Sequence, residues 1–236
     1  MCERFHAMNN KTYDRRLLIA FDMDGTLIDG RLVFALADRF GLSDKVREIQ
    51  EDRILHGYEQ SISIARLFRG LSANNITEAI ESIRLTKNCE KVVWELKEQG
   101  HVLGIISDSY DIAVNYVANK LSFDFYESNT LELDSDGKLT GNINMPLGWQ
   151  KNGCYCKISV CKRYCLERNA DKFQIDAGRT IAVGDTKSDL CMIENAAVGI
   201  AFMPKHKILE DMADVSIKEP DFGYLRQLIV KHLRKA

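Results

Sequence analysis

The stretch from Leu17 to Leu27, LLIAFDMDGTL, constrains the fold of this chain more than any other part of it. Five apolar residues come first, then two aspartates one residue apart, and then Gly25. A short apolar run that ends in a turn signal is typical of a buried strand in a parallel sheet with both faces covered. Asp22 and Asp24 follow that strand, and open α/β sheets bind ligands at the carboxyl ends of their strands. On this stretch alone, a cation or catalytic site and a plain polar turn with an aspartate cap explain the two residues equally well.

Two different patterns follow along the chain. Between residues 31 and 84, apolar residues recur at helical spacing, and we expect successive amphipathic helices that form either a lid or a part of the core. From Asn88 on, helices alternate with short apolar strands, and Asp136-Gly137 predicts the turn of a β-hairpin. The alternation predicts an α/β fold, a doubly wound parallel sheet with a helical insert and a hairpin. The elements expected in this half include strands over 123–126 and 131–133 and a helix over 157–168.

Two more of the expected strands end in polar residues. The strand over 102–106 is followed by Ser107, and the strand over 180–183 is followed by Asp185 and then Asp189. Parallel strands present these ends on one edge of the sheet, so the side chains can meet the two aspartates of the first strand there. Carboxylates in one small space repel each other unless a divalent cation lies among them, and oxygen ligands favour Mg²⁺ over zinc. The sequence therefore predicts a Mg²⁺ site at this edge.

The composition argues against several functional classes. Apolar residues make up 45% and charged residues 28% of the 236 residues, as is ordinary for a globular protein. The net charge of −2 gives no electrostatic reason to expect nucleic acid or an anionic membrane as a partner. No apolar run has the ~20 residues of a membrane helix, and the first residues show no secretory signal. Seven cysteines without such a signal indicate reduced thiols, and we expect a cytoplasmic protein.

Four short motifs, in a fixed order, carry a resemblance to a known family. DMDGTL at 22–27, IISDS at 105–109 and GDTKSD at 184–189 resemble the first, second and fourth motifs of the haloacid dehalogenase superfamily. Lys157, early in an expected helix, resembles the lysine of the third motif. The resemblance runs from about Leu17 to the end of the chain. It narrows to the phosphoserine phosphatase-like branch on three further runs: DIAVNYVANKL at 111–121, GKLTG at 137–141 and MIENAAVGIAF at 192–202.

The resemblance implies a division of the chain into two domains. Residues 15–30 and 88–236 would form the Rossmann-like α/β catalytic core. Residues 31–87 would form a small helical cap, inserted between the first and second motifs. Residues 1–14 are expected to be a flexible tail.

The resemblance also implies a Mg²⁺-dependent phosphomonoester hydrolase that acts on a small phosphorylated metabolite. Asp22 would attack phosphorus and form an aspartyl-phosphate, and Asp24 would act as general acid and then general base. Ser107 and Lys157 would hold the phosphoryl oxygens. The implied metal-binding residues are Asp22, Asp24 through its backbone carbonyl, Asp185 and, as an orienting group, Asp189. The implied substrate-binding residues are Gly25, Thr26, Arg31, Asp108 and Ser109.

The chain departs from the phosphoserine-binding pattern of that branch. Arg31 stands where the branch has a glutamate for the substrate amine, and Ile64 stands where it has an arginine for the carboxylate, with Arg66 and Arg69 nearby. Asp108 and Ser109 replace two glycines. A cation in place of an anion disfavours a substrate ammonium, so we expect a substrate with a second anionic group, such as a sugar phosphate or another anionic phosphate, rather than phosphoserine.

Other functions and features stay open at this point. A phosphotransferase would pass the phosphoryl group from Asp22 to an alcohol, and a phospho-accepting regulatory module would only hold it; receiver modules are shorter and have no helical insert. The cap argues against a bulky protein substrate. Oligomeric state has no sequence signal. Cys154, Cys156, Cys161 and Cys165 surround Lys157, but their spacing matches no common zinc motif, which favours ordinary buried cysteines.

Overall fold

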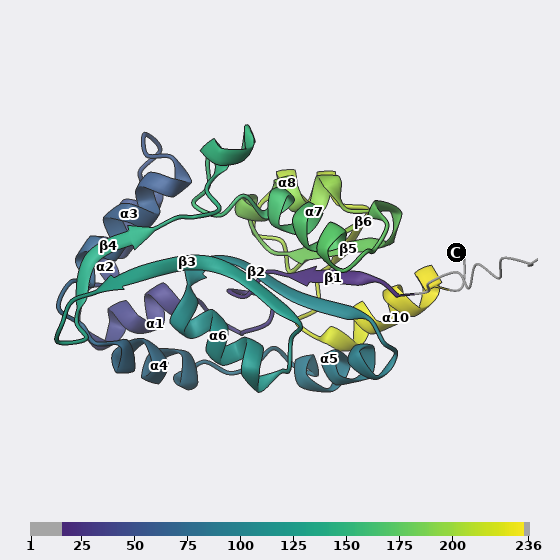
Figure 1. Cartoon of the computed structure of the whole chain (residues 1–236), viewed down its shortest axis with the longest axis horizontal. Helices are drawn as coiled ribbons and strands as arrows, with labels where there is room; N and C mark the ends of the chain where they lie inside the picture. The colour runs from purple at the N-terminus through teal and green to yellow at the C-terminus, as the bar shows by residue number, and fades with distance from the viewer. Residues whose placement is uncertain (1–15, 234–236) are drawn as a thin grey trace, which may run out of the picture.

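A seven-stranded sheet, in the order β4-β3-β2-β1-β5-β6-β7, lies at the centre of the computed structural model, which describes residues 16–233 (Figure 1). The strand pairs are parallel except β3 with β4, which is antiparallel and lies at one edge. The chain winds outward from β1 in both directions, so the predicted doubly wound sheet is confirmed. The strands are β1 (Leu18–Phe21), β2 (Val102–Tyr110), β3 (Phe125–Leu133), β4 (Leu139–Asn144), β5 (Thr180–Gly184), β6 (Val198–Phe202) and β7 (Val215–Ile217).

The central strand β1 is buried on both faces, as its apolar run predicts. Ile19 and Phe21 point into one apolar cluster, and Leu18 and Ala20 point into the other. The four residues are fully inaccessible to solvent. Because successive side chains of a strand point to opposite faces, an uninterrupted apolar run is required where helices cover both sides.

Helices cover both faces of the sheet (Figure 1). Helices α5, α6 and α10 pack against the face that receives Phe21, and α7, α8 and α9 pack against the other. The α-helices are α1 (Leu32–Arg39), α2 (Ser43–Glu51), α3 (Gly57–Leu67), α4 (Ala73–Ser82), α5 (Cys89–Glu98), α6 (Asp111–Lys120), α7 (Lys162–Lys172), α8 (Leu190–Asn195), α9 (Lys207–Met212) and α10 (Phe222–Leu233). The 3₁₀ turns are η1 (Trp149–Asn152), η2 (Ala177–Arg179) and η3 (Lys187–Asp189).

Helices α1 to α4 form the expected helical insert, and they share the apolar core of the sheet. Leu36 and Ile80 belong to the same buried cluster as β1. The ring of Phe68 packs edge-on against Tyr110 of β2, with 6.3 Å between the ring centroids. The β3–β4 hairpin extends alongside the insert and binds it through the backbone, where the Leu139 N–H donates to the Leu71 carbonyl at 2.8 Å. The insert is therefore a packed layer over one end of the sheet.

Two expected elements differ in the structure. Residues 125–133 form the single strand β3, where two separate strands were expected, because the segment pairs with β2 first and with β4 beyond it. Helix α7 begins at Lys162, five residues later than expected. Lys157 has a φ of 51°, in the left-handed region, and its carbonyl accepts a hydrogen bond from Tyr58 N–H at the start of α3. This long-range contact keeps residues 157–161 out of the helix.

Within residues 16–233, no helix is both long and apolar enough to cross a membrane. The expected tail over residues 1–14 lies outside the described residues.

Candidate active site

Three buried carboxylates meet at the carboxyl ends of β1 and β5. Asp22 follows β1, Asp185 follows β5, and Asp189 ends the turn η3. Carboxylate oxygens of the three residues lie within 4.8 Å of one another. The Asp22 N–H donates to the Val183 carbonyl at 2.9 Å, which extends the β1–β5 pairing up to the nucleophile candidate. The predicted convergence of distant strand ends is thus what the chain forms.

A buried lysine lies between two of these carboxylates. Lys162 Nζ is 2.5 Å from Asp22 Oδ1 and 2.6 Å from Asp189 Oδ1, and the side chain is fully inaccessible. The sequence-based choice of Lys157 is wrong in geometry: Lys157 Nζ lies 3.3 Å from His56 Nε2, at the protein surface. The error follows from the expected helix start. One signal separates the two lysines, because Lys162 heads the buried stripe of α7 that continues at Cys165 and Asn169.

Asp189 is fully occupied by hydrogen bonds. Its Oδ1 accepts from Lys162, and its Oδ2 accepts from the backbone N–H groups of Asp185 and Thr186 at 3.0 and 2.9 Å. Gly184 leaves room for this carboxylate, since a Cβ there would lie 2.3 Å from Asp189 Cγ. Asp189 therefore positions Lys162 and the loop after β5.

Burial determines the protonation of Asp22. Burial raises the pKa of Asp22 well above its usual range; Lys162 opposes this shift, and Asp189 and Asp185 add to it. Burial lowers the pKa of Lys162, but Asp189 and Asp22 outweigh burial, so its pKa is raised and the ammonium stays charged. The buried ammonium thus does not cancel the effects of burial and of the neighbouring carboxylates on Asp22, whose pKa stays raised.

The donor set fits a divalent cation. Asp185 Oδ1 is buried and has no hydrogen-bond partner within residues 16–233. Its Oδ2 is 2.6 Å from Lys205 Nζ and 3.9 Å from Arg31 Nη2, so cations already gather at this carboxylate. Gly25, with a φ of 82°, closes the site, because a Cβ there would lie 2.2 Å from Asp185 Oδ2. Buried carboxylate oxygens that lack partners are the ligands that hard divalent cations prefer.

Asp24 caps helix α1 and faces the neighbouring cavity. Its Oδ1 accepts a hydrogen bond from Leu32 N–H at 2.6 Å. Burial raises the pKa of Asp24 to about 6, against the hydrogen bond from Leu32 and the charge of Arg31, while Asp108 adds to the rise. A carboxyl with a pKa in this range can both give and accept a proton near neutral pH.

A cavity of about 610 Å³ separates the carboxylates from helices α1 to α3. Asp22, Asp24, Arg31, Asp108, Ser109 and Ile64 are among its lining residues. Six expected site residues lie outside the lining: Lys157, Asp185 and Asp189, described above, and Ser107, Thr26 and Gly25. Ser107 is buried, and its Oγ accepts from Ser109 N–H at 3.2 Å; the Thr26 carbonyl accepts from Thr86 Oγ1 at 2.6 Å; Gly25 packs on Asp185.

The two arginines near Ile64 do not reach this cavity. Arg66 and Arg69 pack against Gly141 of the β3–β4 hairpin. Three other cations line the cavity instead: Arg31, Arg53 and Lys187. Burial lowers the pKa of His206, which also lines the cavity, and the charges of Lys187, Arg31 and Lys205 lower it further, so its neutral form is favoured. Arg31 and Lys187 therefore supply positive charge near His206.

A hydrogen-bonded chain, missed at the sequence level, connects the second motif to the insert. Asn129 Nδ2 on β3 donates to the Asp108 carbonyl at 2.7 Å and to Ser159 Oγ at 2.8 Å. Ser61 Oγ of α3 is 3.1 Å from Ser159 Oγ. Isolated Asn and Ser residues have no motif that would have marked them.

Comparison with known proteins identifies the class of this site. Residues 19–194 match the haloacid dehalogenase-like hydrolases, and the chain belongs to that family. Its fold and site define a phosphatase, as predicted.

Within the family, the chain resembles phosphoserine phosphatases. It is 32% identical to phosphoserine phosphatase of Methanocaldococcus jannaschii over 218 residues, which cover 91% of this chain and 97% of that protein. It is also 32% identical to phosphoserine phosphatase of Archaeoglobus fulgidus over 222 residues, 92% of this chain, but spans only 61% of that longer protein. A solved phospho-aspartyl intermediate analogue of phosphoserine phosphatase superposes with a TM-score of 0.79 at 29% identity, over 90% of this chain and 98% of the other.

Proposed function

We propose that this phosphatase hydrolyses a small phosphomonoester with Mg²⁺ and forms an aspartyl-phosphate on Asp22. The observation that carries the proposal is the buried Lys162 ammonium, which lies 2.5 Å from Oδ1 of Asp22, a residue that lines the cavity. A buried nucleophile beside a fixed cation is prepared to receive an anionic phosphoryl group. The similarity to a phospho-aspartyl intermediate analogue supports the same intermediate here.

Two half-reactions follow from the two aspartates. A carboxylate oxygen of Asp22 attacks phosphorus, and the bond from phosphorus to the substrate oxygen breaks while Asp24 donates a proton to that oxygen. Water then attacks the aspartyl-phosphate, Asp24 takes the proton of the water, and inorganic phosphate leaves with Asp22 regenerated. The pKa of about 6 fits Asp24 to both proton transfers.

Two side chains would hold the phosphoryl oxygens. We assign this role to Lys162 instead of Lys157, because Lys162 Nζ lies 2.5 Å from Oδ1 of the nucleophile Asp22. Ser107 lies on β2, beside β1, and its Oγ accepts from Ser109 N–H, which leaves its own hydroxyl hydrogen free to donate.

Mg²⁺ would be held by the carboxylates of Asp22 and Asp185 and by the backbone carbonyl of Asp24, with Asp189 as a positioning group. When bound, it would offset the repulsion between carboxylate and phosphate and keep Asp22 ionised despite burial. We propose in addition that residues 31–87 act as a cap, since α1, α2 and α3 contribute residues to the cavity lining.

Activity measurements with one variant test the reaction. Phosphate release from a generic aryl phosphate should require Mg²⁺, stop with a chelator, and fall to background in Asp22→Asn while the circular dichroism spectrum is unchanged. Substantial residual turnover in Asp22→Asn would overturn the nucleophile assignment. An added acceptor alcohol should receive no phosphate; transfer to the alcohol would establish a phosphotransferase instead.

The positive charge at the cavity indicates the substrate class. Arg31 and Lys187 favour a second anionic group, such as a carboxylate, and disfavour an ammonium at Arg31. Phosphoserine, the substrate in the names of the relatives, has both groups. We therefore expect a carboxylated phosphomonoester without an amine to be the better substrate.

Three matched compounds separate the contributions of the two groups. Phosphoethanolamine has the amine alone, phosphoserine has amine and carboxylate, and 3-phosphoglycerate has the carboxylate with a hydroxyl in place of the amine. We expect kcat/KM to be highest for 3-phosphoglycerate and lowest for phosphoethanolamine, and Arg31→Glu to move the preference towards the amines by about tenfold or more. Phosphoserine far above both other compounds in the unaltered protein would refute this substrate class.

A further inference from the structure

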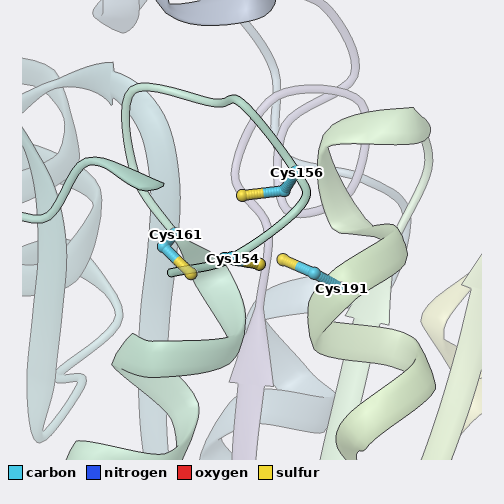
Figure 2. Close-up of side chains that lie close together, drawn as sticks. All are labelled: Cys154, Cys156, Cys161 and Cys191. Atoms are coloured by element: carbon cyan, nitrogen blue, oxygen red, sulfur yellow. The ribbon is translucent and has the colours of Figure 1, made fainter. Parts of the chain in front are cut away.

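Four cysteine thiols meet on the side of the molecule where α7 and α8 begin (Figure 2). Cys154 and Cys156 lie on the loop after η1, Cys161 is the N-cap of α7, and Cys191 is the second residue of α8. The sulfur atoms all lie within 4.8 Å of one another. Each of the four is a free thiol.

The membership of this cluster corrects the grouping made from the sequence. Cys165 follows Cys161 by one helical turn, but it packs in the apolar cluster beside Leu166 on the sheet side of α7. Cys191 takes its place, although it lies thirty residues after Cys161 along the chain. The spacing of the cysteines along the chain could not predict Cys191 as a member, because only the packing of α8 against α7 brings it to the others.

The surroundings of the sulfurs differ from those of ordinary core cysteines. Cys154, Cys161 and Cys191 are at most 3% exposed, and the thiols point at one another rather than at aliphatic neighbours. Trp149 and Tyr164 cover the group. Four thiols that face each other in an apolar shell have little to gain from packing alone, because sulfur is a weak hydrogen-bond partner.

Several N–H groups lie near the sulfurs. The backbone N–H groups of Ile158, Tyr164 and Arg163 lie near the sulfurs of Cys156, Cys161 and Cys191, in that order. The Arg163 guanidinium lies near Cys154. Two of the backbone donors belong to the first turn of α7, where N–H groups have no partner inside the helix. Donors of this kind stabilise negative charge on sulfur.

We propose that Cys154, Cys156, Cys161 and Cys191 form a structural zinc site, with all four thiolates as ligands. Zinc prefers four-coordinate tetrahedral thiolate sites, and a Zn–S distance of about 2.3 Å sets the sulfurs ~3.8 Å apart. The present separations, up to 4.8 Å, reach that geometry by small shifts of side chains and of the loop. The nearby N–H groups and the Arg163 guanidinium would offset the double negative charge of the resulting centre.

The site is closed and lies outside the catalytic cavity. None of its four cysteines is among the lining residues of that cavity, and four protein ligands leave no position for a substrate. The zinc would cross-link the two segments that carry the buried ion pair of Lys162 and Asp189. Cys161 directly precedes Lys162, and Cys191 follows Asp189 by two residues. The zinc would also anchor Ile158, which lines the cavity. This inference does not depend on the proposed substrate or on Mg²⁺.

Elemental analysis of the intact, purified chain tests the site. We expect about one zinc per chain after expression with added zinc, retained on dialysis against a weak chelator. We expect a tetrahedral cobalt-thiolate absorption spectrum when Co²⁺ replaces zinc under reducing conditions. Cys156→Ser, at the most exposed ligand, and Cys191→Ser should each lower bound zinc at least tenfold. Cys165→Ala, a matched buried cysteine outside the cluster, should keep it, and so should Asp185→Asn.

Several results would overturn the proposal. These are less than a tenth of an equivalent of zinc and no cobalt-thiolate spectrum in the unaltered chain, iron in place of zinc, zinc retained in both serine variants, or zinc lost in Asp185→Asn. Disulfides among the four cysteines in protein alkylated before mass spectrometry would also overturn it. Because the cobalt spectrum and the metal content are measured on the unaltered chain, poor folding of a variant leaves the test decisive.

Discussion

The two lysines of the third motif region provide a direct test of the site. We consider Lys162→Met, which removes the buried ammonium between Asp22 and Asp189, and Lys157→Met, which removes a surface ammonium beside His56. Both changes replace a lysine with a side chain of similar length. Only the first leaves two buried carboxylates without their cation.

The structure sets the size of the effect. Removal of one partner from a buried ion pair costs about 3–5 kcal/mol, because the remaining charge stays buried. In a domain of this size 1 kcal/mol corresponds to about 2–4 °C, so the melting temperature of Lys162→Met should fall by about 6–20 °C. Loss of one charged donor to a developing oxyanion lowers kcat by about 10²–10³-fold. Lys157→Met, at the surface, should change stability by no more than about 0.5 kcal/mol and leave kcat unchanged.

Thermal unfolding of both variants tests the expected change in stability, and their Mg²⁺-dependent phosphate release tests the expected change in kcat. Lys162→Arg keeps the charge and should recover part of the stability but little of the turnover, since a planar guanidinium does not fit a site built around a compact ammonium. The reasoning is refuted if Lys157→Met loses turnover while Lys162→Met retains it. Equal stability of the two variants would show that the buried ion pair has no net effect on folding.

The remaining predictions concern a glycine and a histidine away from this lysine. Gly25 and Gly100 have nearly the same φ, 82° and 81°, in the left-handed region. Replacing either with alanine should therefore cost about 1–2 kcal/mol of stability. Only Gly25→Ala pushes a methyl group into Asp185, so only it should raise the Mg²⁺ concentration needed for half-maximal activity; an equal rise in both would contradict the contact. Burial lowers the pKa of His101, whose Nδ1 accepts from Leu17 N–H at 3.3 Å. Its neutral form stabilises the fold fully above pH 6.5, and the contribution falls below that pH as the unfolded chain takes up the proton. Urea unfolding on either side of pH 6.5 should therefore show a smaller pH dependence in His101→Asn, and an unchanged dependence would exclude His101 as its source.

Predictability from the sequence depended on whether a feature was local. The strand before Asp22 and its partner strand before Asp185 could be predicted, because apolar runs that end in acidic residues mark buried parallel strands and their shared edge. The start of α7 could not, since the Lys157 carbonyl is bound by Tyr58 of another helix. The same limit hid Cys191, whose partners come from a different helix and a loop.

The packing of the helical insert determines which parts of the cavity wall are costly to move. Phe68 is fully buried against Tyr110, and exposure of one such side chain costs about 1.5–3 kcal/mol. To lift α1 to α4 as one body would expose Leu36 and Ile80 too, which multiplies that cost. Between α2 and α3, by contrast, Arg53 is exposed and lines the cavity. The connection between α2 and α3 is therefore the part of the cavity wall whose movement exposes the least buried apolar surface.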